Sequence, residues 1–196
     1  DRNHFVYNAS LTKGLIPLLE DIWPKIKSQI PEAYLTVIGG YYKFREYSEL
    51  DEQGKQLKEL IKDPKYKKLD VNFTDVIPQK QVAEILKYAG FMLYPNIFPE
   101  TSGISSLESL LYKTPIITNT FGALEETAVS QACYKLDYPV EPNVLFQDIN
   151  KNLQIENFVK LTVDAYNDPY LYQQKCNYCS VIDDIVSWDT IALEWK

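Results

Sequence analysis

The segment from residue 91 to residue 119, FMLYPNIFPETSGISSLESLLYKTPIITN, decides the fold of this chain. Its apolar run at 91–95 predicts a buried strand, and SSLESLLYK at 105–113 predicts a helix. The turn at 101–103 lies between them, so free backbone N–H groups meet the positive end of the helix dipole there. Such a junction suits a phosphate group, and Gly103 lets a ligand approach the backbone closely.

Strand-like and helix-like segments alternate on both sides of this junction, which predicts a parallel sheet with helices on both faces. The fold class is therefore α/β, a doubly wound sheet of about six strands. The expected strands are 4–10, 33–40, 71–77, 91–95, 115–119 and 133–137. The expected helices are 12–30, 47–63, 79–89, 105–113, 123–131, 152–168, 169–182 and 187–196, with a loop at 137–152.

Two glutamates flank the turn, Glu100 just before it and Glu108 about one turn inside the helix. Each carboxylate can accept hydrogen bonds from hydroxyl groups on opposite sides of a phosphate. A helix N-cap and a glutamate on a solvated helix face explain the same residues. The spacing alone leaves a ligand site and an ordinary helix start as alternatives.

The stretch FPETSGISSLESLLYKTPIITNTFGALEE at 98–126 resembles the donor-binding segment of the retaining glycosyltransferases of family 4, which share the two-domain GT-B fold. In that family a Glu, seven residues and a second Glu precede a small-residue-rich helix, a Pro-led buried strand and a Gly-rich turn ending in Glu. The residues in those places are Glu100, Glu108, Pro115, Gly122 and Glu126. The resemblance covers nearly all of the chain and implies a Rossmann-like domain, the C-terminal half of a GT-B fold.

The resemblance also implies a site for a nucleotide diphosphate sugar. Lys13 matches the family's diphosphate-binding lysine, and Gly14 lets the following helix begin tightly beneath it. Glu100 is expected to hold the donor sugar and Glu108 the ribose hydroxyls, which makes Lys13 and Glu100 the candidate catalytic residues. The other expected donor contacts are the backbone N–H groups of Ser102, Gly103 and Ile104, and a base slot at Val76, Ile77 and Pro78. Core packing explains this last group equally well, and Glu126 can serve simply as an acid at a helix start.

One loop departs from the family pattern. An Arg usually precedes the lysine there, whereas residues 7–10 are Tyr-Asn-Ala-Ser. Lys43 or Arg45 is a candidate replacement, although a surface role explains both as well. Asp183–Asp184 lacks the Asp-x-Asp spacing of metal-dependent transferases. We therefore expect no metal and no other cofactor, with helix N-termini and basic side chains stabilising the leaving diphosphate.

Composition narrows the class of function. A formal net charge of −7 argues against nucleic-acid binding. Three cysteines (Cys133, Cys176, Cys179) and a single histidine indicate a reducing compartment and argue against a zinc site. We expect a cytoplasmic protein, with peripheral association at the inner face of a membrane through an N-terminal domain absent from this sequence.

The predicted function is retaining, metal-independent transfer of a hexose from a nucleotide diphosphate sugar to a glycan, lipid-linked or other acceptor. Residues 1–180 are expected to bind the donor, and the tail helix at 181–196 to pack on the missing N-terminal domain, which would bind the acceptor. The fragment alone is expected to be inactive. A sugar-nucleotide epimerase of GT-B architecture and a non-catalytic nucleotide-sugar-binding module are the alternatives. A Rossmann dehydrogenase is disfavoured because Gly39–Gly40 does not continue into G-x-G-x-x-G.

Overall fold

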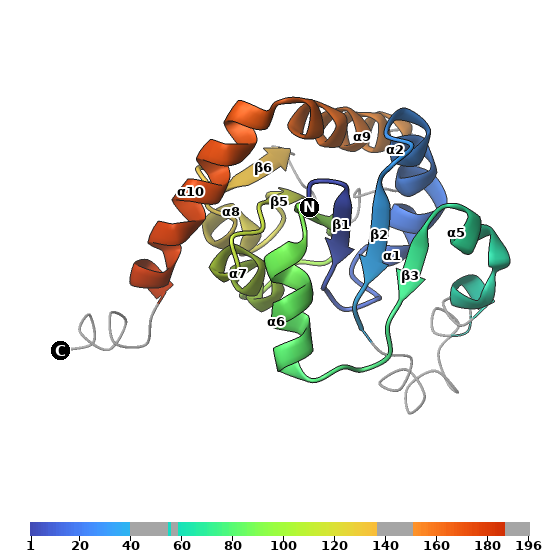
Figure 1. Ribbon diagram of the computed structural model, residues 1–196, viewed down its shortest axis with the longest axis horizontal. Helices are drawn as coiled ribbons and strands as arrows, with labels where there is room; N and C mark the ends of the chain where they lie inside the picture. Colours follow the sequence, from blue (N-terminus) through green and yellow to red (C-terminus); the bar gives the residue numbers. More distant parts are fainter. Residues whose placement is uncertain (40–54, 56–58, 137–150, 187–196) are drawn as a thin grey trace.

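Six parallel strands form a single sheet in the computed structural model, which describes residues 1–39, 55, 59–136 and 151–186 (Figure 1). The strands are β1 (His4–Tyr7), β2 (Tyr34–Val37), β3 (Val71–Phe73), β4 (Phe91–Tyr94), β5 (Ile116–Asn119) and β6 (Cys133–Leu136). Their order across the sheet is β3-β2-β1-β4-β5-β6. The chain therefore reverses its direction of travel between β1 and β4, the topological switch point of a doubly wound sheet. The predicted fold class and the six strands are confirmed, but the strands predicted at 4–10 and 71–77 are too long, since β1 ends at Tyr7 and β3 at Phe73.

Helices cover both faces of this sheet (Figure 1). They are α1 (Leu15–Pro17), the π-helical turn η1 (Leu18–Ile22), α2 (Trp23–Gln29), α5 (Pro64–Lys68), α6 (Gln79–Tyr88), α7 (Ile104–Leu111), α8 (Leu124–Thr127), α9 (Lys151–Asn167) and α10 (Pro169–Val186). The two long C-terminal helices close the domain, since α9 packs on η1, α2, β5 and β6, and α10 packs on α7 and α9.

The central strands are buried along their whole length, because a parallel sheet is covered by helices on both sides. Every residue of β1, β4 and β5 is buried. Phe5 of β1 stacks on Phe91 of β4 with ring centroids 5.3 Å apart. The core thus holds β1 and β4 together at the switch point, where the ends of the two strands position the loops that follow them.

The predicted helix at 12–30 is wrong in two respects, because it begins only at Leu15 and is not a continuous α-helix. Pro24 has no N–H to continue the α-helical ladder. The N–H of Trp23 instead bonds to the carbonyl of Leu18, five residues earlier, which makes the π-helical turn η1. Two proline-bearing α-helical segments, α1 and α2, flank this turn.

The predicted helix at 123–131 is also too long. α8 ends at Thr127, and Ala128 leaves the helical conformation with a ψ of 79°. Only five residues separate α8 from Cys133, where β6 begins, so the chain must turn back to the sheet at once.

Some expectations lie largely or wholly outside the described residues. Of the helix predicted at 47–63, only residue 55 and residues 59–63 are described, and 59–62 are helical. The loop at 137–152 is described only from Lys151, where α9 begins, and the tail helix at 187–196 is not described. The last described helix, α10, extends to Val186, past the boundary expected at residue 180.

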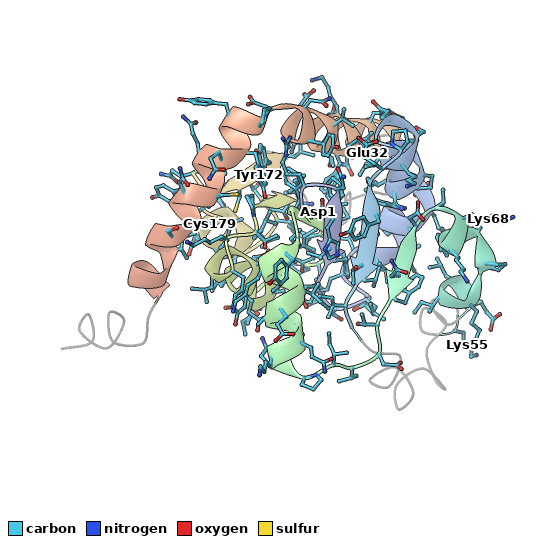
Figure 2. All side chains as sticks on the ribbon, viewed as in Figure 1. Asp1, Glu32, Lys55, Lys68, Tyr172 and Cys179 are labelled. Carbon is cyan, nitrogen blue, oxygen red and sulfur yellow. The ribbon has the colours of Figure 1, made fainter. Side chains whose placement is uncertain are left out.

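The three cysteines are free thiols, and Figure 2 shows Cys179 on α10. Burial raises the pKa of both Cys133 and Cys179 to about 12, so both stay protonated at neutral pH. Among the described helices, none is both long and apolar enough to cross a membrane.

Candidate ligand-binding site

A cleft lies at the carboxyl ends of the strands, where open α/β sheets bind ligands. Its volume is about 340 Å³. It is lined by Asn8, Ala9, Ser10, Leu11, Ile38, Gly39, Val76, Ile77, Val82 and Ser105. These residues follow β1, β2 and β3 or belong to the first turns of α6 and α7, so five separate segments build the cleft.

An ion pair joins the loops that follow β1 and β4, on the two sides of the switch point. Lys13 lies in the loop after β1, and its Nζ donates a 2.8 Å hydrogen bond to Oε1 of Glu100, in the loop after β4. The Glu100 side chain is only 7% exposed, whereas that of Lys13 is 25% exposed. Lys13 Nζ also lies 4.7 Å from the centre of the Phe98 ring, a cation–π contact. The structure thus brings together the two candidate catalytic residues.

Glu100 has two further hydrogen-bond donors. The hydroxyl of Tyr94, the last residue of β4, donates to the same Oε1 atom, and the backbone N–H of Gly103 donates to the carboxylate. Burial by itself would raise the pKa of Glu100, but the hydrogen bonds from Lys13 and Tyr94 outweigh it and hold the pKa below its usual value. Burial also raises the pKa of Tyr94. Glu100 is therefore an ionised acceptor and Tyr94 a neutral donor.

Two glycines shape the backbone around this ion pair. Gly103 is the N-cap of α7 and has a φ of 69°, and a Cβ there would lie 2.9 Å from Oγ1 of Thr127. Gly14, with a φ of 124°, lies so close to β4 that a Cβ would be 2.1 Å from the carbonyl oxygen of Pro95. Both positions therefore require glycine because of neighbouring protein atoms, and the predicted approach of a ligand to Gly103 stays a prediction.

The first turn of α7 is open to a ligand. No described side chain caps this helix. Ser102 and Ile104 are exposed, Ile104 to 66%. Because the first N–H groups of a helix have no partner within it, those of α7 point out beside Glu100 with the positive end of the dipole.

Glu108 lies near the cleft rather than on a free helix face. Its Oε2 accepts a 3.3 Å hydrogen bond from Nδ2 of Asn8, and its Oε1 accepts a 2.7 Å bond from Nε2 of Gln79. Asn8 lines the cleft, as do Val76 and Ile77 of the predicted base slot. Glu108 thus contacts one residue of the cleft that Val76 and Ile77 also line, and the ribose and base assignments stay predictions.

Four residues that contact the candidate site residues were not predicted as part of the site. Tyr94 was predicted only as a strand residue, and Gln79 only as the start of a helix. Asn8 belongs to the loop in which an Arg was sought, and Phe98 to the quoted motif. The contacts of Asn8, Gln79 and Phe98 join segments that only the fold brings together. Tyr94 lies only six residues before Glu100, but nothing in an apolar strand marks its hydroxyl as a donor to that carboxylate.

Other predicted residues have structural roles or lie outside the site described above. Gly122 forms a parallel β-bridge with Glu100, and the N–H of Ala123 donates to the Glu100 carbonyl over 2.8 Å. Glu126 is exposed in the first turn of α8, which fits an acid at a helix start. Lys43 and Arg45, the candidate replacements for the missing Arg, lie outside the described residues.

A doubly wound parallel sheet with a cleft at the carboxyl ends of its strands defines the class of nucleotide-binding α/β domains. Residues 4–160 match the sequence profile described as "Glycosyl transferases group 1". The chain belongs to this family, which confirms the resemblance of residues 98–126 to a glycosyltransferase. No curated protein sequence matches the chain.

Solved structures of glycosyltransferases share the fold. The pneumococcal O-GlcNAc transferase GtfA, in complex with UDP and GlcNAc, superposes with a TM-score of 0.69 at 13% identity, covering 98% of this chain and 34% of that one. Sucrose-phosphate synthase from Thermosynechococcus elongatus gives a TM-score of 0.67 at 20% identity, covering 100% of this chain and 44% of that one. The chain thus spans less than half the length of either protein.

A third solved structure is itself a single domain. The C-terminal domain of LpcC, a glycosyl transferase group 1 family protein from Francisella tularensis, gives a TM-score of 0.65 at 14% identity. The match covers 93% of this chain and 85% of that domain. The fold is therefore that of a GT-B C-terminal domain.

Proposed function

We propose that this chain is the donor-binding domain of a retaining glycosyltransferase that moves a hexose from a nucleotide diphosphate sugar to a glycan, lipid-linked or other acceptor. The observation that carries the proposal is the meeting of Lys13 and Glu100, 2.8 Å apart, across the switch point. Membership of the glycosyl transferases group 1 family supports it. The shared fold of the pneumococcal enzyme, in complex with UDP and GlcNAc, supports a nucleotide sugar as the ligand.

The nucleoside part of the donor would occupy the cleft. The Glu108 carboxylate can accept hydrogen bonds from both ribose hydroxyls, a task that suits its two oxygens. The amide groups of Asn8 and Gln79 each donate a hydrogen bond to one oxygen of this carboxylate. Val76 and Ile77 would then flank the base at the far side of the cleft.

The diphosphate and sugar would lie at the start of α7. Lys13 and the backbone N–H groups of Ser102, Gly103 and Ile104 supply positive charge where negative charge accumulates on the leaving group. Glu100 would accept hydrogen bonds from sugar hydroxyls and fix the orientation of the ring. In this proposal the electrostatic work falls to these groups and no metal takes part.

Retention of configuration follows if the acceptor attacks on the face that the diphosphate leaves. The bond from the anomeric carbon to the phosphate oxygen breaks while the bond to the acceptor oxygen forms. The acceptor proton passes to the departing phosphate, so no side chain of this chain is assigned as a nucleophile. The acceptor would bind to the part of a longer protein that corresponds to the unmatched length of the relatives, at the cytoplasmic side of a membrane where the acceptor is lipid-linked.

Calorimetric titration with UDP, GDP and ADP sugars tests the donor assignment. We expect one of these nucleotides to bind, and Glu108→Ala and Lys13→Ala each to weaken binding at least about tenfold, because each removes charge-assisted hydrogen bonds. Glu84→Ala, an exposed glutamate of α6, is the matched control and should bind as wild type does. Failure of every nucleotide sugar to bind contradicts the proposal, and binding that survives Glu108→Ala removes the ribose assignment.

A non-catalytic nucleotide-sugar-binding module is the second candidate, because residues 7–10 carry no Arg beside Lys13. Assay of a longer protein that contains this domain separates the two candidates. Release of the nucleotide diphosphate with transfer of sugar supports the transferase. Binding without turnover supports the module, and an epimerised nucleotide sugar would identify the epimerase alternative.

A further inference from the structure

The buried carboxylate of Glu100 accepts hydrogen bonds from three donors. Lys13 Nζ, the Tyr94 hydroxyl and the Gly103 N–H all donate to it, and two of these donors share Oε1. Lys13 is also the cation that the proposed function assigns to the diphosphate. A diphosphate that draws Lys13 away would leave a 7% exposed carboxylate close to new negative charge.

Tyr94 is held rigidly enough to take over from Lys13. Its side chain is fully buried, with 0% exposure, at the end of the central strand β4. Its ring lies edge-on to that of Tyr7, with centroids 6.2 Å apart, and its backbone carbonyl accepts a 2.8 Å hydrogen bond from Oγ1 of Thr118. The Lys13 side chain, by contrast, is 25% exposed.

We propose that Tyr94 is a positioning residue that keeps Glu100 ionised and correctly oriented when Lys13 moves from Glu100 to the donor diphosphate. This inference rests on the proposed function. Glu100 must stay ionised to accept hydrogen bonds from sugar hydroxyls through both oxygens, since a protonated carboxyl offers a donor at one of them. Without Tyr94 the Gly103 N–H would be the one other donor now on Glu100, and the proposed function assigns that N–H to the diphosphate.

The charged and titratable groups that face Glu100 are few among the described residues. Lys13 comes from the loop after β1, and Tyr94 comes from β4. The third group is Tyr7 of β1, whose pKa is raised in part by the negative charge of Glu100. Burial raises the pKa of Tyr7 and Tyr94, so neither brings a charge at neutral pH. Departure of Lys13 therefore removes the main source of positive charge, and the pKa of Glu100 would rise unless Tyr94 stabilises its anion.

The positioning role of Tyr94 is tested by calorimetric titration of the wild type and of Tyr94→Phe. The ligand is the nucleotide sugar that the wild-type chain binds. The sugar diphosphate has no group that titrates near pH 6, so binding at about pH 6 in buffers of different ionisation enthalpy reports protons taken up by the protein. We expect no proton uptake by wild type. Tyr94→Phe should bind about three- to tenfold more weakly and take up a fraction of a proton, because the hydrogen bond counts most after Lys13 has left.

Two variants control this measurement. Tyr134→Phe makes the same change at another buried strand tyrosine, in β6, whose hydroxyl has no hydrogen-bond partner, and it should behave as wild type does. Tyr94→Phe combined with Glu100→Gln should lose the proton uptake, because the titrating carboxyl is gone. The inference is overturned if proton uptake persists in this double variant. It is also overturned if Tyr94→Phe binds the donor as tightly as wild type does and takes up no proton.

A measurement on the wild-type chain does not depend on how the variants fold. The carboxyl ¹³C shift of Glu100, followed against pH with donor bound, should show a pKa that stays below the usual glutamate value. A pKa raised above that value by the donor overturns the role of Tyr94 but leaves donor binding intact. Absence of donor binding by wild type overturns the proposed function, and this inference with it.

Discussion

Replacing Gly14 with alanine should separate the two loops that build the site. Gly14 has a φ of 124° and a ψ of 5°, a conformation that residues with a Cβ rarely adopt. The added Cβ would lie 2.1 Å from the carbonyl oxygen of Pro95 and 3.0 Å from its carbonyl carbon. Both atoms belong to the backbone beyond β4, beside Asn96, which is completely buried. No flexible side chain can move aside to relieve the overlap.

Two costs add in this variant. A strained backbone conformation costs about 1–3 kcal/mol, and forcing extra volume into a packed region costs about 1–3 kcal/mol. We expect Gly14→Ala to lower the free energy of unfolding by about 4 kcal/mol, which for a domain of this size lowers Tm by about 8–16 °C. Part of the strain would be relieved by moving Lys13 away from Glu100, so nucleotide-sugar binding should fall as well.

Gly39→Ala separates the two costs. Gly39 has a φ of 139°, but a Cβ there would meet nothing closer than 3.5 Å, at Cδ2 of Leu11. Its cost should therefore be the backbone strain alone, about 1–3 kcal/mol. Urea unfolding of the three proteins measures both values. If Gly14→Ala costs no more than Gly39→Ala, the close approach of Gly14 to Pro95 does not constrain the fold and the reasoning is refuted.

Three further predictions concern stability. Burial lowers the pKa of His4 to about 4, so the unfolded chain takes up the proton first as pH falls below about 6.5. The free energy of unfolding should then drop by about 3 kcal/mol between pH 6.5 and 4. His4→Gln keeps an amide for the 2.8 Å contact with Thr36 and should remove this part of the pH dependence, as measured by urea unfolding at several pH values. Lys175→Met should cost about 2 kcal/mol in urea unfolding, because the buried ammonium donates 3.0 and 2.7 Å bonds to two backbone carbonyls that would lose their partner; an unchanged midpoint would contradict this. Trp23→Phe should cost about 2–3 kcal/mol by thermal unfolding, since the buried indole fills the core and donates a 2.8 Å bond to the Leu69 carbonyl, and a loss below about 1 kcal/mol would show that the core repacks freely.

Most of the fold could be predicted from the sequence, because its strands are short apolar runs separated by helical patterns. The strand at 91–95 and the helix at 105–113 match β4 and α7 to within two residues. The prediction failed where apolar spacing continued past a local break. Pro24 interrupts the ladder inside an otherwise regular pattern, and α8 ends early because the chain must return to the sheet.

The candidate site was predictable in its motif residues and not in their partners. Glu100, Glu108 and Lys13 were found because the sequence around each resembles the family pattern. Asn8 lies 100 residues from Glu108 along the chain, and Gln79 lies 29 residues from it. An asparagine in a loop and a glutamine at a helix start are common in any sequence, so only their positions in the fold reveal what they bind.

The sequence alone determined the alternation of strands and helices, the glycines at the tight turns and the carboxylates around the start of one helix. These features depend on neighbours along the chain, since burial periodicity and backbone conformation are local properties. The tertiary structure decided which loops meet. Lys13 and Glu100 are 87 residues apart, yet they lie within 2.8 Å because β1 and β4 are adjacent at the switch point. Strand order follows from long-range packing and right-handed crossovers, and no local pattern in the sequence encodes it.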